Sequence, residues 1–334
     1  MPARWFTRCI KRAGRFALAL AVLAAPLAVD AQQPRTGYRI GWIGNDPPDA
    51  NLPFGAFRQG LGELGWVEGR NVVIEHRHSA GMSERFPALA AELIRLQVDL
   101  IVASAMPATL AAKRATTTIP IVAVGLSDPV GQGLAASLSR PGGNVTGVAL
   151  LFPELAAKRL ELLKEALPGV SRVTVMWNEA NPGNVHQMEE TKLVAQTLGL
   201  KLQSVPVRSP KDFQAAFAAM TRARAEAVVV LADPLTITYR TQIVALAAKS
   251  RLPTIHPFRE SVEAGGLMAY GVDLPDMYRR AAPYVDKILR GAKPGDLPIE
   301  QPTKFEFVIN MKAAKALGLA IPPSLLLRAD RVVE

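Results

Sequence analysis

Hydrophobic and polar positions follow a regular rhythm along the chain from residue 37 onward. Short apolar runs rich in Val, Ile and Leu alternate with longer stretches in which apolar residues recur at helical spacing. Apolar runs without internal alternation are typical of strands buried on both faces, as in a parallel sheet covered by helices. The first half of the chain therefore predicts strands at 38–43, 71–75, 100–103, 119–124 and 145–150 and helices at 54–64, 83–96, 107–116 and 130–138.

The same rhythm restarts near residue 154. It predicts helices at 154–167, 185–198, 210–224 and 235–249 and strands at 172–177, 201–205, 227–231 and 253–256. Two consecutive units of the same order, with no low-complexity linker between them, indicate two similar α/β lobes. The remainder predicts a strand at 267–270, a helix at 275–290, a Pro/Gly-rich stretch at 293–302, a strand at 304–309, a short helix at 312–317 and an irregular tail.

The fold class expected from this pattern is α/β, with two doubly wound parallel-sheet lobes joined by a hinge. The C-terminal remainder is too short for a third domain, so we expect it to complete the two lobes. Lobe 1 should then comprise residues 37–150 and about 271–302, and lobe 2 residues 151–270 and about 303–334. In this arrangement the chain crosses between the lobes more than once.

Residues 1–31 have the features of a secretory signal peptide. A basic start, an apolar run at 16–29 and small residues at Val29 and Ala31 follow one another in the order that such a peptide requires. The apolar run is shorter than the ~20 residues of a transmembrane helix, which disfavours a retained anchor. No cysteine stands at the expected cleavage point, so nothing indicates a lipid anchor. We therefore expect a periplasmic protein.

Charge and cysteine content exclude several classes of function. The signal segment holds five of the 39 basic residues and one of the 29 acidic residues, which leaves 34 against 28, a net charge of +6. Basic residues downstream are scattered, so the sequence predicts no nucleic-acid partner. The only cysteine, Cys9, leaves with the signal peptide. The mature chain is thus expected to have no disulfide, no cysteine-ligated metal and no cysteine nucleophile.

Candidate binding residues follow from the strand positions. In open parallel sheets, ligands bind at the carboxyl ends of the strands, where the N-termini of the following helices point. Polar segments stand at these ends, and most of them lead into a proline that opens the next helix. We predict a ligand site made of Asn45, Asp46, Ser104, Met106, Pro107, Ser127, Asp128, Asn178, Asn181, Asp233, Phe258 and Tyr270. For any one of these polar residues, simple helix capping is the competing explanation.

The chemistry of these segments suits a small ligand with an anionic group such as a carboxylate, because free helix N-termini favour negative charge. Asp128 or Asp233 could pair with an ammonium group on the same ligand, which would suit an amino-acid-like solute. Phe258 and Tyr270 stand beside turns and are the preferred stacking candidates.

Motifs for other chemistry are incomplete. Residues 131–136 fit a degenerate dinucleotide fingerprint, but the following predicted strand supplies no acidic residue for a ribose, so helix packing explains them better. His76 and His78 would share one face of a strand, yet no third metal ligand stands near them in the sequence. The sequence has no nucleophile elbow, no zinc-protease motif and no phosphate-binding P-loop. We therefore predict no catalytic residue, metal or cofactor.

Five segments of the mature chain resemble the bacterial ABC transporter substrate-binding protein family that includes tryptophan-binding TrpX-like proteins. They read FGAFRQGL at 54–61, GWVEGRN at 65–71, SDPV at 127–130, RPGGNVTG at 140–147 and INMKAAKALG at 309–318. The resemblance covers essentially the whole mature protein. It implies a type I periplasmic-binding fold and capture of a small molecule by closure of two lobes, without chemistry on the ligand. It does not carry over the identity of that ligand.

The resemblance also implies a membrane permease of an ABC importer as the partner, and we expect the protein itself to be a monomer. Two other functions remain open at this point. The protein could instead report ligand binding to a membrane receptor, because fold alone does not separate a sensor from a transporter component. It could also be a periplasmic enzyme that uses Asp128, Asp233 or Glu260 as acid or base, which requires a displaced pKa. A DNA-binding regulator is disfavoured, because an export signal occupies the N-terminus.

Overall fold

Two α/β sheets organise the part of the chain that the computed structural model describes, residues 37–47, 52–150 and 152–334. The first sheet has the strand order β2-β1-β3-β4-β5, and all of its pairs are parallel. Its strands are β1 (Tyr38–Gly44), β2 (Val72–His78), β3 (Leu100–Ser104), β4 (Ile121–Leu126) and β5 (Val145–Ala149). The last three are buried at every position, because helices cover both faces, as their uninterrupted apolar sequences predict.

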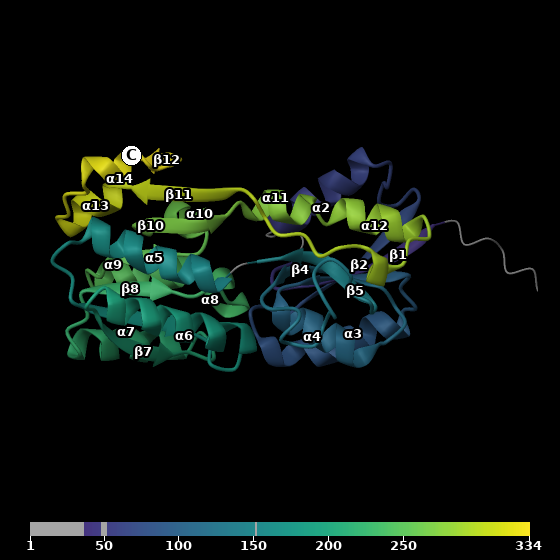
Figure 1. Cartoon of the computed structure of the whole chain (residues 1–334), viewed down its shortest axis with the longest axis horizontal. Coiled ribbons are helices and arrows are strands. Elements are labelled where there is room, and N and C mark those ends of the chain that lie inside the picture. Colours follow the sequence, from purple (N-terminus) through teal and green to yellow (C-terminus); the bar gives the residue numbers. More distant parts are fainter. Residues whose placement is uncertain (1–36, 48–51, 151) are drawn as a thin grey trace, which may run out of the picture. The chain divides into compact units, whose positions relative to one another are not determined.

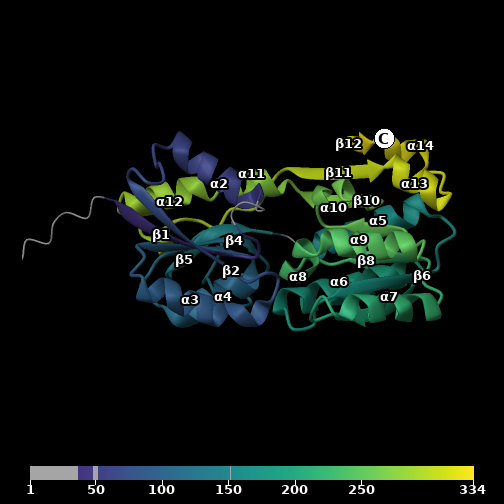
Figure 2. The same cartoon turned by 180° about the vertical axis from the view of Figure 1, so that it is seen from behind.

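Helices of the first half cover this sheet (Figures 1 and 2). They are α2 (Leu52–Glu63), the 3₁₀ turn η2 (Ser83–Arg85), α3 (Phe86–Arg95) and α4 (Met106–Ala115). The apolar side of α3 and α4 packs against the sheet in one cluster that includes Phe86, Leu93 and Ile101. On the other face, Phe57 and Leu61 of α2 pack in a second cluster.

The second sheet has seven strands in the order β12-β11-β10-β9-β8-β6-β7. They are β6 (Arg172–Trp177), β7 (Lys201–Pro206), β8 (Ala227–Val230), β9 (Thr254–His256), β10 (Met268–Val272), β11 (Phe305–Asn310) and β12 (Arg331–Val333). Every pair is parallel except β10 with β11, which run antiparallel. The predicted doubly wound pattern thus holds, with two reversed strands, β11 and β12, added at one edge.

Helices cover both faces of the second sheet as well. They are α5 (Phe152–Ala166), α6 (Pro182–Thr197), α7 (Asp212–Arg222), α8 (Pro234–Thr238), α9 (Arg240–Lys249), α10 (Arg259–Glu263), α13 (Met311–Leu317) and α14 (Pro323–Leu326). Residues of α5, α6 and α13 share one buried cluster with the sheet, and residues of α7 and α9 share another. In Figure 2, α7 and α9 lie over the same sheet as β8 and β6.

The chain returns to the first sheet between β10 and β11. Helices α11 (Leu274–Arg279) and α12 (Ala282–Leu289) pack against α2, as Figure 1 shows. Trp66 Nε1 donates to Asp286 Oδ1 at 2.9 Å in the same region. Beyond the 3₁₀ turn η3 (Pro294–Asp296), Glu300 lies beside β5, where its N–H donates to the Gly147 carbonyl oxygen at 3.0 Å.

We call the five-stranded sheet with α2–α4, α11 and α12 lobe 1, and the seven-stranded sheet with its helices lobe 2. Together the described residues of Gly37–Glu334 form one compact unit. The exact boundaries expected near residues 150, 271 and 302 stay a prediction. The signal peptide predicted at 1–31 lies outside the described residues.

Several sequence-based expectations were wrong in detail. The segment 130–138 is not a helix but a series of turns. Gly133 has a φ of +69°, and the N–H groups of Leu134 and Ala135 both donate to the Pro129 carbonyl oxygen, which turns the chain back on itself. The tail is not wholly irregular, since it forms α14 and adds β12 to the sheet edge.

Two long predicted helices are each divided in two. The helix expected at 235–249 breaks at Tyr239, and the one expected at 275–290 breaks between Arg279 and Ala282. Pro283 stands in the first turn of α12, where its missing N–H costs nothing, and this placement favours a new helix start.

Candidate functional site

A pocket of about 40 Å³ lies where residues of both lobes meet at the carboxyl ends of the strands. This cavity is smaller than the ~300–1,000 Å³ that is typical of small-molecule sites, so a solute can enter only if the lining residues move apart. The lining residues come from the end of β1, α2 and α11 of lobe 1 and from β8, α8, α9, α10 and the turn after β9 of lobe 2: Asp46, Pro53, Val230, Thr236, Ile237, Arg240, His256, Pro257, Phe258, Glu260, Ser261 and Leu274.

Hydrogen bonds join the two lobes beside this pocket. Thr238 Oγ1, at the end of α8, donates to Asp46 Oδ1 at 2.8 Å. The Tyr239 hydroxyl donates to the Ala80 carbonyl oxygen at 3.3 Å. Both bonds connect the turn after α8 to segments that follow β1 and β2, so the strand ends of the two lobes face each other as the sequence predicts.

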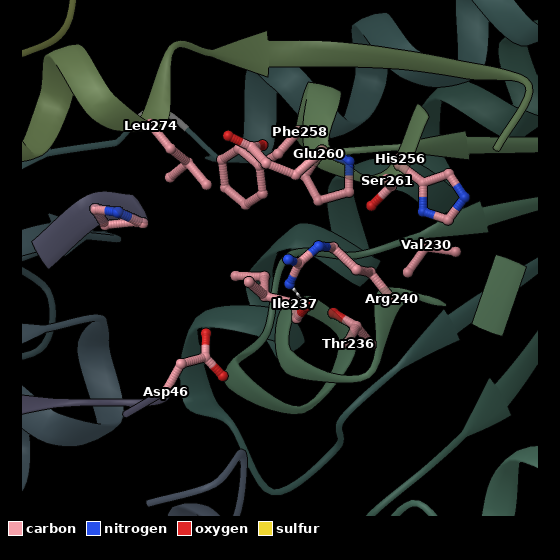
Figure 3. A pocket seen from close by; sticks show the side chains of 12 residues that line it. Asp46, Val230, Thr236, Ile237, Arg240, His256, Phe258, Glu260, Ser261 and Leu274 are labelled. Atoms are coloured by element: carbon pink, nitrogen blue, oxygen red, sulfur yellow. Dashed lines mark hydrogen bonds between the residues drawn. The ribbon is translucent and has the colours of Figure 1, made fainter. Parts of the chain in front are cut away.

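Glu260 is the most unusual polar residue of the pocket. Its side chain is only 11% exposed, and neither carboxylate oxygen has a hydrogen-bond partner in the part of the chain that the structure describes. Burial raises the pKa of this carboxyl above its ordinary value, because the charged form loses its hydration. In Figure 3, Glu260 and Phe258 lie on one side of the pocket and Ile237 and Arg240 on the other.

The cations around Glu260 are occupied elsewhere. Arg259 Nε is 4.0 Å from Glu260 Oε1, but its Nη1 donates to Asp273 Oδ2 at 3.0 Å and to Glu306 Oε1 at 2.8 Å. Arg240 Nη1 donates to the Ile237 carbonyl oxygen at 2.9 Å. The pocket therefore holds a buried acid and a basic side chain that do not form an ion pair with each other in this structure.

His256 contributes a neutral polar ring. Its Nε2 lies 2.9 Å from Thr254 Oγ1, and burial lowers the pKa of the imidazole to about 3. The ring is consequently uncharged near neutral pH, and it can take part in hydrogen bonding without adding a charge to the pocket.

Asp233 lies in a separate, fully buried hydrogen-bond network with two other predicted site residues. Its carboxylate accepts from Asn181 Nδ2 at 2.8 Å, from Asn178 Nδ2 at 3.2 Å and from the N–H of Leu235 at 2.8 Å. It also caps α8 in a capping box with Thr236. Burial raises the pKa of Asp233, and the hydrogen bonds act in the opposite direction. The structure thus brings these three residues together, and both asparagine side chains donate hydrogen bonds to the Asp233 carboxylate.

The predicted residues of lobe 1 are spread over several environments. Asp46 lines the pocket, and the neighbouring Asn45 is buried with its Oδ1 lacking a hydrogen-bond partner among the described residues. The Ser104 hydroxyl is hydrogen-bonded to that of Tyr278, and Met106 is buried in the core of the lobe.

Pro107 and the Ser127-Asp128 turn lie away from this pocket. Pro107 lines a different hollow, together with Asn178 and Arg208 of lobe 2. Ser127 is buried close to Gly183, whereas Asp128 is exposed, has a φ of +50°, and accepts from the N–H of Gly131 at 2.9 Å.

The two stacking candidates have different positions. Phe258 lines the pocket, whereas Tyr270 packs against Phe305 at a ring-centroid distance of 6.4 Å and is not part of the lining. Of the twelve predicted residues, Asp46 and Phe258 therefore line this pocket directly. Whether the others touch a ligand stays a prediction.

Sequence reasoning did not place Arg240, and it named Glu260 only as an enzymatic acid or base. Glu260 lies in the first turn of α10, directly after the strand end of β9 that supplied Phe258. Arg240 opens α9 at a helix break that the periodicity did not reveal, and no signal in the sequence distinguishes it.

Arg159 of α5 is a further polar residue that the sequence did not single out. It is completely buried, its Nε donates to the Tyr270 carbonyl oxygen at 2.7 Å, and neither Nη atom has a hydrogen-bond partner in the described chain. Burial lowers the pKa of the guanidinium to about 9. Such a side chain is costly to fold, because no acid offsets the lost hydration.

Two histidines lie close together in lobe 1, but the described ranges offer neither a metal site nor a membrane span. His76 and His78 lie near each other, with ring centroids 6.1 Å apart, but no group of three or more His, Cys, Asp or Glu residues in 37–47, 52–150 and 152–334 could hold a metal ion. No helix in the same ranges is long and apolar enough to cross a membrane.

Comparison with known proteins agrees with this architecture. Residues 48–333 match the model of a family described as ABC transporter substrate binding protein. The chain belongs to this family. The resemblance predicted from the sequence is thereby confirmed.

Individual relatives share both sequence and fold. A tyrosine-binding protein of Clostridioides difficile (strain R20291) is 26% identical over 263 residues, which cover 79% of this chain and 75% of that protein. Two solved structures match this chain over 89% of its length and over the full length of their own chains. One, from Vibrio cholerae, has a TM-score of 0.83 at 30% identity, and the other, an ABC domain of Streptococcus pneumoniae in complex with L-Trp, has a TM-score of 0.82 at 29% identity. The expected fold class, with two α/β lobes of the type I periplasmic-binding kind, is also confirmed.

Proposed function

We propose that this family member is the periplasmic component of an ABC importer and that it captures an amino-acid-like solute in the pocket between Asp46 and Glu260. The observation that carries the proposal is the composition of the pocket: both lobes line it, at the carboxyl ends of their strands. This is the place where ligands bind in open α/β sheets. A ligand held there would contact both lobes, and those contacts would favour the closed arrangement.

The charges of the pocket support an amino-acid-like ligand. A buried acid, Glu260, and a basic side chain, Arg240, line the same hollow as the apolar side chains of Ile237, Phe258 and Leu274. A zwitterion with an apolar side chain matches this combination of one acid, one base and apolar walls. The relatives that bind tyrosine and L-Trp make aromatic amino acids the first compounds to test.

The site in the cell and the partner are part of the same proposal. The basic and apolar segments before residue 31 support export to the periplasm, and family membership supports a permease as the partner. We propose a monomer that binds neither nucleic acid nor a cofactor. Of the three candidate carboxylates, Asp128 is exposed and the Asp233 carboxylate already accepts hydrogen bonds from two asparagines, which leaves Glu260. We assign Glu260 to ligand binding and not to catalysis.

The test is a thermal-melt screen of the mature protein, followed by titration calorimetry of every hit. The screen should contain the twenty amino acids, sugars and small aromatic acids. A specific ligand at 100 times its Kd stabilises the fold by ~2.7 kcal/mol, which a melt resolves easily. No response to any compound would contradict solute capture.

Two further measurements separate the alternatives. Chromatography of the recovered ligand should return it unchanged, whereas a new product would support an enzyme. Cells that lack this protein should lose high-affinity uptake of the ligand. Unaltered uptake together with a lost transcriptional or motility response would support the sensor function.

A further inference from the structure

Glu260, whose side chain is 11% exposed, differs from the fully buried Asp233 of lobe 2 in how its carboxylate oxygens are used. Asp233 accepts three hydrogen bonds, so its burial is compensated. Both oxygens of Glu260 lack a hydrogen-bond partner, although the side chain is almost fully enclosed. Buried polar groups in proteins are nearly always hydrogen-bonded, and exceptions point to a functional role.

The surroundings of Glu260 explain why the protein does not satisfy this carboxylate itself. Arg259, the next residue, is held by Asp273 and Glu306, which turn its guanidinium toward β11 and the segment after β10. Arg240 donates to a backbone carbonyl of its own turn. Ser261 and His256 line the same pocket, and the His256 ring bonds to Thr254. The Glu260 carboxylate thus lines the pocket as a hydrogen-bond acceptor, and no side chain of the described residues donates to it.

We propose that Glu260 is the residue that selects the ligand, by accepting hydrogen bonds from a cationic nitrogen such as the ammonium group of an amino acid. This inference rests on the proposed function and assigns its specificity to one side chain. A carboxylate inside a largely apolar enclosure binds an ammonium strongly and rejects the same molecule without it, because the acid is then left buried and unpaired.

The protonation of Glu260 gives the proposal a second observable. The raised pKa of Glu260 has burial as its main cause. The residue's own backbone N–H, Arg259 and Arg240 act in the opposite direction, and Glu263 adds to the rise. Asp46 and the neutral His256 are the other titratable groups that line the pocket. An ammonium requires the ionised carboxylate, so binding releases the proton of any molecule in which Glu260 is protonated. Affinity should therefore fall as the pH is lowered through the pKa of Glu260.

The experiment compares Glu260→Gln with Glu263→Gln by titration calorimetry. Glu263 is on the same short helix, is exposed, and pairs with Arg331 outside the pocket, which makes it a matched control. The probes are L-tryptophan, L-tyrosine and the two corresponding acids that lack the amino group, followed by the remaining standard amino acids. Each titration is repeated in two buffers of different ionisation enthalpy.

We expect Glu260→Gln to weaken binding of the amino acid at least tenfold, to leave the acid without an amino group bound equally well or better, and to abolish the proton release. Glu263→Gln should change neither affinity by more than about twofold. Equal loss of both probes in Glu260→Gln, or wild-type affinity for the amino acid, would overturn the assignment. A Glu260→Gln melting temperature at or above that of the wild type shows that the variant is folded.

Failure of the wider proposal is distinguishable from failure of this one. If the wild-type protein binds a sugar or an acid but none of the amino acids, the ammonium assignment is wrong while solute capture stands. If it binds nothing in the whole screen, both proposals fail.

Discussion

Replacement of Arg159 by methionine should stabilise the ligand-free protein, although it removes a hydrogen bond. The guanidinium is fully buried, has two Nη atoms without hydrogen-bond partners in the described chain, and has a pKa lowered from 12.5 to about 9. At 1.36 kcal/mol for each pH unit, this difference corresponds to about 5 kcal/mol of unfavourable free energy for folding with the charge in place. Loss of the charged hydrogen bond to Tyr270 offsets about 1.5–3 kcal/mol of this gain.

The net gain expected for Arg159→Met is therefore about 2–3.5 kcal/mol, part of which is lost because the smaller side chain packs imperfectly. For a chain of this size, a change of 1 kcal/mol moves Tm by roughly 2–4 °C. Urea denaturation at pH 7 without ligand measures the gain. Arg159→Lys serves as the control, because it keeps a positive charge at the position and should show no gain.

The stabilisation by Arg159→Met should also depend on pH. Arg159 is a base whose pKa is lowered in the folded state, so its cost is complete below about pH 9 and declines as the pH rises further. The advantage of Arg159→Met should shrink accordingly between pH 9 and 11. A variant that is less stable than the wild type at pH 7 would refute the reasoning, since it would show that the guanidinium has a compensating partner in solution.

Three other outcomes can be checked with the same methods. Asp233→Ala leaves buried donors without an acceptor and should cost about 2–4 kcal/mol in urea unfolding; a folded variant with lost ligand affinity would assign Asp233 to the ligand instead. His256, with its pKa lowered to about 3, stays neutral in the fold, so stability should fall by about 1.4 kcal/mol per pH unit below pH 6.5, and less steeply in His256→Gln. Gly271→Ala places a Cβ against the Pro257 carbonyl oxygen of the pocket wall and should weaken ligand binding as well as stability, whereas Gly62→Ala, on an open face of α2, should gain about 0.5–1 kcal/mol. Unchanged binding in Gly271→Ala would show that the wall is not rigid.

Much of the fold was predictable from the sequence because its strands are buried on both faces. Every strand predicted from an apolar run, such as 172–177, is present within a few residues of its expected bounds. The segment 130–138 was predicted wrongly, because its apolar periodicity hid the conformational effect of Gly133. The antiparallel pairing of β11 depends on contacts with residues far away in the sequence, to which local patterns are insensitive.

The candidate site was less predictable for a different reason. The rule that ligands lie at strand ends led to Asp46 and Phe258, which line the pocket. It could not show that two asparagines donate hydrogen bonds to the Asp233 carboxylate, because these asparagines lie 52 and 55 residues away in the sequence. Arg159 and Glu260 stand out because buried atoms of their side chains lack hydrogen-bond partners in the described chain, and burial is a property of the folded molecule.

The return of the chain to lobe 1 between β10 and β11 determines when the protein can fold during its synthesis. The packing face of α2 is covered by α11 and α12, and the seven-stranded sheet gains β11 and β12 only from the last thirty residues or so of the chain. Neither half can therefore complete its core while the C-terminal segment is still being synthesised. Native contacts of such large sequence separation form late and slowly. We expect the nascent chain to stay open until synthesis ends.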